Sequence, residues 1–303
     1  MKDSMSRVFF VFLSLIGFTY HLSAYEIAIG SMFRNEAHYL KEWVDYHYMA
    51  GVEHFWLYNN NSTDNWEEVL QPYIEKGIVE VTYWPNPAGT CYMKTQVQAF
   101  KDAIKRAQGV AKWIALIDID EFLLPMQDRS IPECLDNHFS DAFAIYVNWL
   151  NFGTGGVYIS QGEPILFRLI SASLRTHSDN GIGKSIVRPE FVDLANVWYL
   201  HHFTLKPDAY YINGNREPMS FVGNDLRPDG RHYDQYIRIN HYVLRDESYY
   251  RNVKLAKPSQ GYPDKNQLLE HYDSFSKVRD YSIINFIQKN YPGKYPGKPS
   301  FEP

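Results

Sequence analysis

The sequence has little cysteine and no excess of positive charge. Its 303 residues include only two cysteines, Cys91 and Cys134, too few for a disulfide framework and without the spacing of a metal site. Thirty Lys and Arg stand against 35 Asp and Glu, giving a net charge of −5. A nucleic-acid-binding surface normally shows a basic stripe, so this composition argues against that class of protein.

A long hydrophobic run is missing as well. The one apolar stretch, Val8 to Phe18, follows Lys2 and Arg7. It is short for a membrane span, which needs about 20 apolar residues, and it matches the apolar core of a signal peptide. We therefore interpret residues 1–24 as a signal peptide or a short membrane anchor. Either one predicts association with a membrane, the secretory pathway or the cell envelope.

From Tyr25 onward, apolar segments with strand spacing alternate with segments of helical spacing. Four strands that alternate with three helices predict a Rossmann-like parallel α/β sheet with right-handed crossovers. The predicted strands are 26–33, 52–58, 78–84 and 113–117, and the predicted helices are 36–50, 66–76 and 93–108.

After Pro125 the alternation fades. This part predicts an antiparallel, loop-rich half that completes the same domain, residues 25–290, with 25–125 as one half and 126–290 as the other. Residues 291–303, rich in Pro and Gly, predict a coil tail. The strands expected in the second half are 141–149, 165–169, 185–188, 197–203 and 236–242, and a helical stretch is expected over 265–290.

Three polar clusters follow the first, second and fourth predicted strands: Arg34-Asn35-Glu36, Asn59 to Asp64, and Asp118-Ile119-Asp120. In parallel α/β sheets, ligands bind beyond the carboxyl ends of the strands. The three clusters, distant in the sequence, are therefore expected to meet at one edge of the sheet.

Asp118 and Asp120 are the strongest candidates for chemistry. Two carboxylates in this spacing at a strand end can share one hard cation, which neutralises a diphosphate leaving group. The alternative is a solvated strand end that caps a helix. The five apolar residues that precede the pair, and its place at the ligand-binding edge, favour the metal site.

The other two clusters allow both structural and functional roles. Asn59 to Asp64 forms a turn in which Asp64 caps the following helix, and its side chains, Asn59, Ser62 and Asp64 among them, can also read the base and ribose of a nucleotide. Asn60 and Asn61 each begin a glycosylation sequon, but a nucleotide site is a poor place for a glycan. Arg34 can reach phosphate oxygens, whereas Glu36 favours a helix start through the helix dipole.

A metal site with two carboxylates still lacks a third protein ligand. Neutral imidazole is a common one, and His241 lies in the strand predicted at 236–242. His202 competes for the same role.

Taken in order over residues 26–260, these and further motifs resemble glycosyltransferase family 92. The similarity is far more specific than an Asp-x-Asp pair alone. The matching stretches are Arg34–Glu36 with Leu40–Trp43, Gly51–Phe55, Asn59–Asp64, Gln96, Lys112–Phe122, Asn148–Gly153, Lys184–Pro189 and Ile239–Tyr242.

The resemblance implies a GT-A type fold and an inverting glycosyltransferase that uses a divalent cation, Mn²⁺ or Mg²⁺. It implies a UDP-sugar donor, with galactose as the default, and a glycan or glycoconjugate acceptor. Asp118 and Asp120 carry over as metal and diphosphate residues, and His241 becomes the favoured third ligand. Gln96 and Lys184 join the donor-binding set, while Arg188 is a weaker candidate for phosphate or acceptor.

Two points stay open at this stage. The catalytic base is expected in the acceptor half, with Asp179 as the candidate and Glu163 as the alternative. The loop Phe152-Gly153-Thr154-Gly155-Gly156 departs from relatives that carry two serines there, which leaves the acceptor open.

Two other functions fit parts of the sequence. A haloacid dehalogenase-type phosphatase also carries an Asp-x-Asp pair after an apolar strand. Its motif has Thr or Val at the position of Phe122, and the pair normally follows the first strand, whereas here it follows the fourth predicted strand. A sugar-binding module that lost turnover would keep the same fold, although intact Asp118, Asp120 and His241 argue against it.

Overall fold

The computed structural model describes residues 24–160, 163–197, 199–219, 221, 231–256 and 264–295. The predicted signal peptide or anchor, except for Ala24, and the end of the predicted tail lie outside these residues. Within the described ranges, no helix combines the length and the apolar character needed to cross a membrane.

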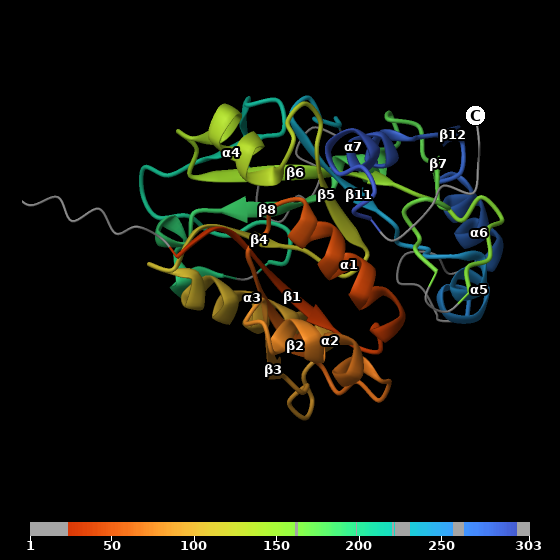
Figure 1. The fold of residues 1–303 in the computed structure, drawn as a ribbon, viewed down its shortest axis with the longest axis horizontal. Coiled ribbons are helices and arrows are strands. Elements are labelled where there is room, and N and C mark those ends of the chain that lie inside the picture. The colour runs from red at the N-terminus through yellow and green to blue at the C-terminus, as the bar shows by residue number, and fades with distance from the viewer. Residues whose placement is uncertain are drawn as a thin grey trace, which may run out of the picture.

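The first half is the predicted parallel sheet. The strands run in the order β4-β1-β2-β3, and each neighbouring pair is parallel. This confirms all four strands and three helices of the prediction and the α/β class that the family resemblance implies (Figure 1). The elements are β1 Tyr25–Phe33, α1 Ala37–Met49, β2 His54–Asn59, α2 Trp66–Ile74, β3 Val79–Tyr83, α3 Tyr92–Ala107 and β4 Ala111–Leu116.

The second half extends this sheet beyond β4, and β11 and β5 form a branch of it at β6. β8 joins β4 and β6 with antiparallel pairing, and β11 pairs antiparallel with β5. β6 pairs in parallel with β9 and β11, so the half is mixed rather than antiparallel throughout. The strands are β5 Glu121–Pro125, β6 Ala144–Asn151, β7 Ser171–Ala172, β8 Gly183–Val187, β9 Tyr211–Asn213, β10 Pro218–Met219, β11 Ile237–His241 and β12 Val278–Arg279.

The helices of this half are short. They are α4 Ile131–Phe139, α5 Glu247–Tyr249, α6 Lys265–Asp273 and α7 Ser282–Asn290, with 3₁₀ turns Ser178–Gly181, Pro189–Phe191 and Leu194–Asn196 and one π-helical turn, Tyr250–Lys254. β5 and α4 were not predicted. The helix expected over 265–290 is two helices, α6 and α7, because β12 between them pairs with β7.

Two predicted strands of the second half are wrong. Residues 165–169 form a turn, in which the amides of Ile165 and Leu166 donate to the Glu42 carboxylate rather than to a neighbouring strand. The described residues of 197–203 also form no strand. There Tyr211 Oη accepts a hydrogen bond from the amide of Phe203, and Ser185 Oγ donates to the carbonyl of His201.

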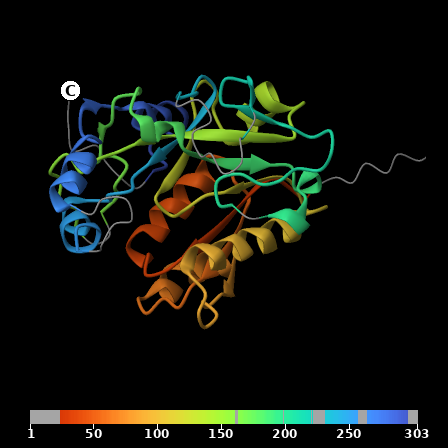
Figure 2. The same ribbon diagram turned by 180° about the vertical axis from the view of Figure 1, so that it is seen from behind.

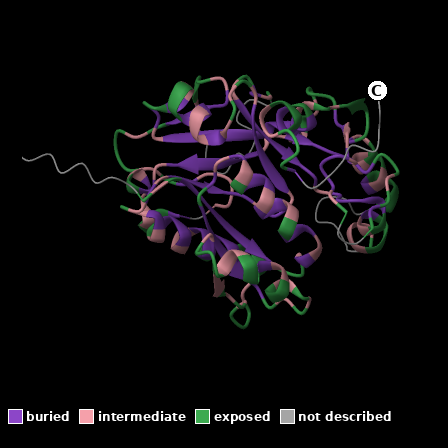
Figure 3. Ribbon diagram, in the orientation of Figure 1, coloured by how far each residue is buried: buried purple, intermediate pink, exposed green. Residues whose placement is uncertain are grey.

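Apolar side chains fill both faces of the sheet. One cluster includes Trp43 of α1 and Phe55 of β2, and the other includes Phe100 of α3 and Ile114 of β4. Figures 1 and 2, seen from opposite sides, accordingly show α1 and α3 on opposite faces. Figure 3 shows the strands buried between exposed helix surfaces. A Cβ at Gly30 would lie 2.7 Å from Ala103 Cβ, so glycine lets α3 approach β1 closely.

Candidate active site

A cavity of about 810 Å³ opens at the carboxyl ends of β1 and β4. Its walls come from the β1–α1 turn, the first turns of α3, the β4–β5 turn and the segment 245–254. The lining residues are Met32, Phe33, Arg34, Asn35, Glu36, Tyr92, Gln96, Asp118, Ile119, Asp120, Arg245, Tyr249, Val253 and Lys254. The sheet edge predicted to hold the ligand therefore carries a cavity with acidic and basic side chains together.

Two of the predicted polar clusters are hydrogen-bonded to each other. Ser62 Oγ accepts from the amide of Asn35 at 3.0 Å, and Asn35 Oδ1 accepts from the amide of Thr63 at 2.8 Å. Asn35 has a φ of +57°, a left-handed conformation that asparagine tolerates, and this bends the chain between β1 and α1. The predicted convergence of the clusters is confirmed.

Asp64 plays a different structural role from the predicted one. Its Oδ2 accepts from the amide of Ala37 at 2.8 Å, so it caps α1, whereas the N-cap of α2 is Asn65, whose side chain makes no capping bond. Asn59 Oδ1 accepts from the amide of Ser62 at 2.9 Å. Asn59, Ser62 and Asp64 thus brace the turn beside the cavity and do not line it. Their predicted contact with the nucleotide stays a prediction.

Asp118 is held by two side chains. Gln96 Nε2 donates to Oδ1 at 2.5 Å, and Lys184 Nζ donates to Oδ2 at 2.7 Å. Glu121 accepts from the amide of Asp118 at 2.8 Å and lies 3.8 Å from Lys184. Burial opposes the charge of Lys184, but Asp118 and Glu121 outweigh it and raise the pKa of Lys184 above its ordinary value. Lys184, only 1% exposed, therefore supports Asp118 from behind and does not line the cavity.

His241 presents one ring nitrogen toward Asp120. Asn151 Nδ2 donates to Asn180 Oδ1 at 3.0 Å, which turns Asn151 Oδ1 toward His241 Nδ1 at 2.8 Å. Nδ1 therefore carries the proton and Nε2 keeps its lone pair. Burial lowers the pKa of His241 to about 4, so the ring is neutral near pH 7.

Asp120 and His241 fit a divalent cation. Asp120 Oδ1 and His241 Nε2 face each other at 3.9 Å, two acceptors with no proton between them. Burial alone would raise the pKa of Asp120, but Arg245 and His241 lower it below its ordinary value. A divalent cation held by these two side chains would satisfy both acceptors.

The full predicted ligand set of Asp118, Asp120 and His241 is not assembled as it stands. Within the part of the chain that the structure describes, no three His, Cys, Asp or Glu side chains are grouped to hold a metal ion. Both oxygens of Asp118 are already hydrogen-bonded. The role of Asp118 as a direct metal ligand stays a prediction.

Other predicted residues lie away from the cavity. Asp179 Oδ2 lies 3.2 Å from His271 Nε2, and Glu163 lies 3.4 Å from Arg168, so the structure does not bring either candidate base to this site. His202, the competing metal ligand, stacks on the ring of Phe221 at 4.0 Å. Arg188 donates to the carbonyl of Ala142 at 2.8 Å and lies over the Trp113 ring at 4.7 Å.

Sequence reasoning missed one wall of the cavity. Arg245, Tyr249 and Lys254 come from a turn, a three-residue helix and a π-helical turn, and none of these has a periodic pattern. Their only sequence signal is that they follow His241 closely. π-helical turns are often found at functional sites.

The protein-family model described as glycosyltransferase family 92 matches residues 24–276. The chain belongs to glycosyltransferase family 92. A family 92 protein of Ricinus communis is 29% identical over 198 residues, covering 63% of this chain and 34% of the relative. One of Oryza sativa subsp. japonica is 30% identical, covering 63% and 31%. The chain thus spans about a third of the length of these curated relatives.

The chain is also similar to a third plant protein and to two solved structures. Galactan beta-1,4-galactosyltransferase GALS2 of Arabidopsis thaliana is 32% identical over 96 residues, covering 30% of this chain and 18% of that protein. The solved structure of S. aureus TarS 1-349 with UDP-GlcNAc is 14% identical with a TM-score of 0.36, covering 89% of this chain and 82% of that chain. The Pyrobaculum calidifontis mannosyltransferase PcManGT with GDP-Man and Mn²⁺ is 9% identical with a TM-score of 0.36, covering 89% and 73%.

Proposed function

We propose that the protein transfers a hexose from a UDP-sugar to a glycan acceptor, with inversion and with a divalent cation, Mn²⁺ or Mg²⁺. The observation that carries this proposal is the pair of acceptors, Asp120 Oδ1 and His241 Nε2, which face each other at 3.9 Å where Asp120 lines the 810 Å³ cavity at the sheet edge. Family membership gives the class of reaction. The name of the Arabidopsis galactosyltransferase makes galactose the first sugar to test.

In this reaction the acceptor hydroxyl oxygen attacks the anomeric carbon, its proton passes to a carboxylate, and the bond from that carbon to the UDP oxygen breaks. A divalent cation held by Asp120 and His241 would neutralise the charge that develops on the departing diphosphate. Gln96 and Lys184 fix Asp118, and with it the turn that carries Asp120. Arg34 lines the same cavity and supplies positive charge for the phosphates.

The acceptor has a candidate place nearby. A second cavity, of about 920 Å³, contains Trp84, Tyr199 and Met93, and it shares the first turns of α3 with the donor cavity. Aromatic faces of this kind suit sugar rings. Tyr199→Ala should raise the KM for a glycan acceptor while donor hydrolysis stays unchanged, and an unchanged KM would remove the acceptor from this cavity.

The central test is a donor screen. UDP-sugars incubated with Mn²⁺ should be hydrolysed slowly in the absence of an acceptor, and Asp120→Ala should abolish this hydrolysis. Asp141→Ala is the matched control, since Asp141 is exposed, pairs with Arg216 and does not line the cavity. UDP binding that does not depend on metal would contradict the metal-dependent mechanism. Phosphate release from a monoester would instead favour the phosphatase, and metal-dependent binding without turnover would favour the sugar-binding module.

We also propose that residues 1–24 associate the protein with a membrane or direct it to the secretory pathway or cell envelope. In a bacterium, an uncleaved anchor on the cytoplasmic face would keep the enzyme with its donor. Sequencing the mature N-terminus tests this point, because a start near Tyr25 rules out an anchor.

A further inference from the structure

Arg245 reaches the cavity from the turn that follows β11. Its amide donates to the carbonyl of Tyr242 at 2.8 Å, and its φ of +53° is left-handed, a strained conformation for arginine. Such strain in a non-glycine residue is found preferentially at functional sites. This tight turn starts next to His241 and brings the Arg245 side chain to the cavity that Asp120 also lines.

The guanidinium of Arg245 is fixed by groups from two parts of the chain, the start of α1 and the turn between β4 and β5. Nη1 donates to the carbonyl of Ile119 at 3.0 Å, Nη2 donates to Glu36 Oε2 at 2.8 Å, and the group lies over the Tyr39 ring at 4.5 Å. Nη2 is also 3.9 Å from Asp120 Oδ2. The side chain is therefore already held in one orientation before any ligand arrives.

These contacts do not use all the donors of Arg245. A guanidinium has five N–H groups. The two hydrogen bonds to Ile119 and Glu36 leave three of these groups, and Nε, on a side chain that is only 2% exposed, has no hydrogen-bond partner among the residues that the structure describes. A buried donor with no acceptor is costly, so its persistence at a cavity wall points to an anionic ligand that approaches this side chain.

We propose that Arg245 binds the diphosphate of the nucleotide donor, next to the cation site of Asp120 and His241. This inference rests on the proposed function. A planar guanidinium suits phosphate oxygens, and its attraction to them is stronger in a buried site than in water. Arg34 and Lys254 line the same cavity and add positive charge, whereas Lys184 points to Asp118 behind the wall.

The test compares ligands that differ only in phosphate. Affinities for UDP, UMP and uridine are measured by calorimetry for the wild type, Arg245→Lys and Arg245→Met, in EDTA and again with Mn²⁺. Arg245→Met should weaken UDP binding about tenfold or more in both conditions, the usual scale for a hydrogen bond to a charged group, and leave uridine binding unchanged. Arg245→Lys, which keeps the charge and loses the fork, should fall between the two.

Arg251→Met is the matched control, since Arg251 pairs with Glu247 and its side chain is 62% exposed outside the cavity. An equal loss of affinity for UDP and uridine would show a purely structural role and overturn the inference. Should Arg245→Met fail to fold, Arg245→Lys decides, because an unchanged ratio of UDP to uridine affinity in that variant overturns it as well. A wild-type protein that binds no UDP would instead remove the proposed function.

Discussion

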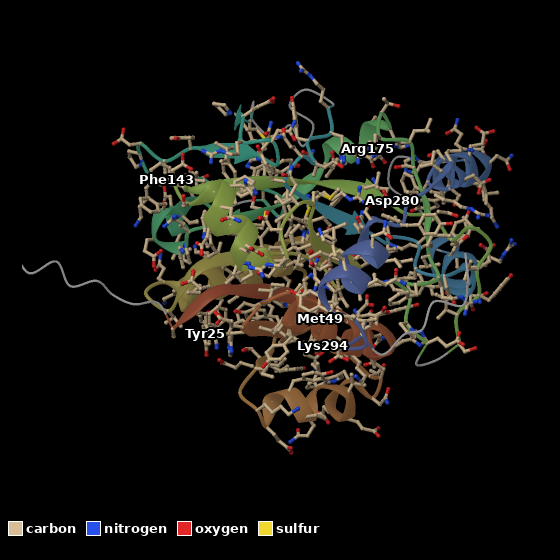
Figure 4. The ribbon with its side chains drawn as sticks, turned by 45° about the horizontal axis from the view of Figure 1, so that its top comes forward. Tyr25, Met49, Phe143, Arg175, Asp280 and Lys294 are labelled. Atoms are coloured by element: carbon tan, nitrogen blue, oxygen red, sulfur yellow. The ribbon has the colours of Figure 1, made fainter. Side chains whose placement is uncertain are left out.

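Two buried arginines on neighbouring stretches of chain have different surroundings. Arg238, within β11, is fully buried. It donates to Asp280 at 2.7 Å and to Asn240 Oδ1 at 2.8 Å, and lies 3.6 Å from Asp234. Figure 4 labels Asp280 and Arg175, and Arg175 bonds to Asp234 at 2.7 Å in the same network. Arg238 is not among the residues that line the donor cavity, whereas Arg245 is.

The partners of the two arginines differ in ionisation. Burial alone would raise the pKa of Asp280, but Arg238 outweighs it and lowers that pKa below its ordinary value. Glu36, the partner of Arg245, is dominated by burial, which raises its pKa to about 7 despite Arg245. Arg238 is therefore matched by ionised carboxylates, whereas Glu36 neutralises Arg245 only in part and the carboxylate of Asp120 lies 3.9 Å from it.

The largest expected effect is the loss of stability that follows when Arg238 is removed from its network of acidic partners. Arg238→Met leaves Asp280 and Asp234 buried without their cation, so it should lower the free energy of unfolding by about 3–5 kcal/mol. Arg245→Met should cost less, because Glu36 can take up a proton. Urea unfolding at pH 7 measures both. Equal losses of unfolding free energy in the two variants would show that both arginines stabilise the fold to the same extent, which contradicts the difference described above.

The second prediction concerns pH and Glu36. The folded protein holds a proton on Glu36 up to about pH 7, whereas the ordinary pKa is 4.5. The stabilisation from this group is therefore complete below pH 4.5 and is lost as the pH rises toward 7, by up to about 3 kcal/mol. Glu36→Gln should remove this part of the pH dependence in urea unfolding with EDTA present. Glu75→Gln, an exposed control, should keep the wild-type curve, and a Glu36→Gln curve that also keeps it would place Glu36 in the ionised state.

The third prediction concerns the tautomer of His241. Asn151→Ala removes the acceptor that holds the proton on Nδ1, so Mn²⁺ affinity should fall about tenfold. Manganese EPR measures this without turnover. Asn137→Ala, which changes an exposed amide bonded to Asp128, should bind Mn²⁺ as the wild type does. If Asn151→Ala bound Mn²⁺ equally well, His241 would not be a ligand in the assumed orientation.

The fold was predictable where local pattern and tertiary structure agree. β1 to β4 and α1 to α3 were found because each helix buries one face on a parallel sheet, which leaves a clear period in the sequence. The apolar residues of 165–169 gave a false strand. Their amides are satisfied by Glu42, a side chain far away in the sequence, and no local rule indicates that.

The candidate site was predictable only where its residues follow the pattern of strands in the sequence. Asp118 and Asp120 could be placed at the cavity because they follow a strand at the ligand-binding edge, and the family resemblance indicated His241; their role as metal ligands stays a prediction. Asp64 was predicted to cap the helix that follows it, because capping residues usually precede their helix directly. In the structure it accepts a hydrogen bond from the amide of Ala37, in the preceding helix α1. Arg245 was missed because only the folded chain brings it to Glu36, across more than half of the sequence.

The smallest expected effect completes the series of arginines. Arg251→Met removes an ion pair with Glu247 in which the arginine is 62% exposed, so water screens much of the attraction. Glu247 Oε2 keeps its hydrogen bond from Thr154, whereas Oε1 loses the hydrogen bond from Arg251. UDP titration should match the wild type, and urea unfolding should show a smaller loss of stability than Arg238→Met does. A loss of UDP affinity comparable to that of Arg245→Met would show that any positive charge on this segment suffices, and the placement of Arg245 within the cavity would lose its significance.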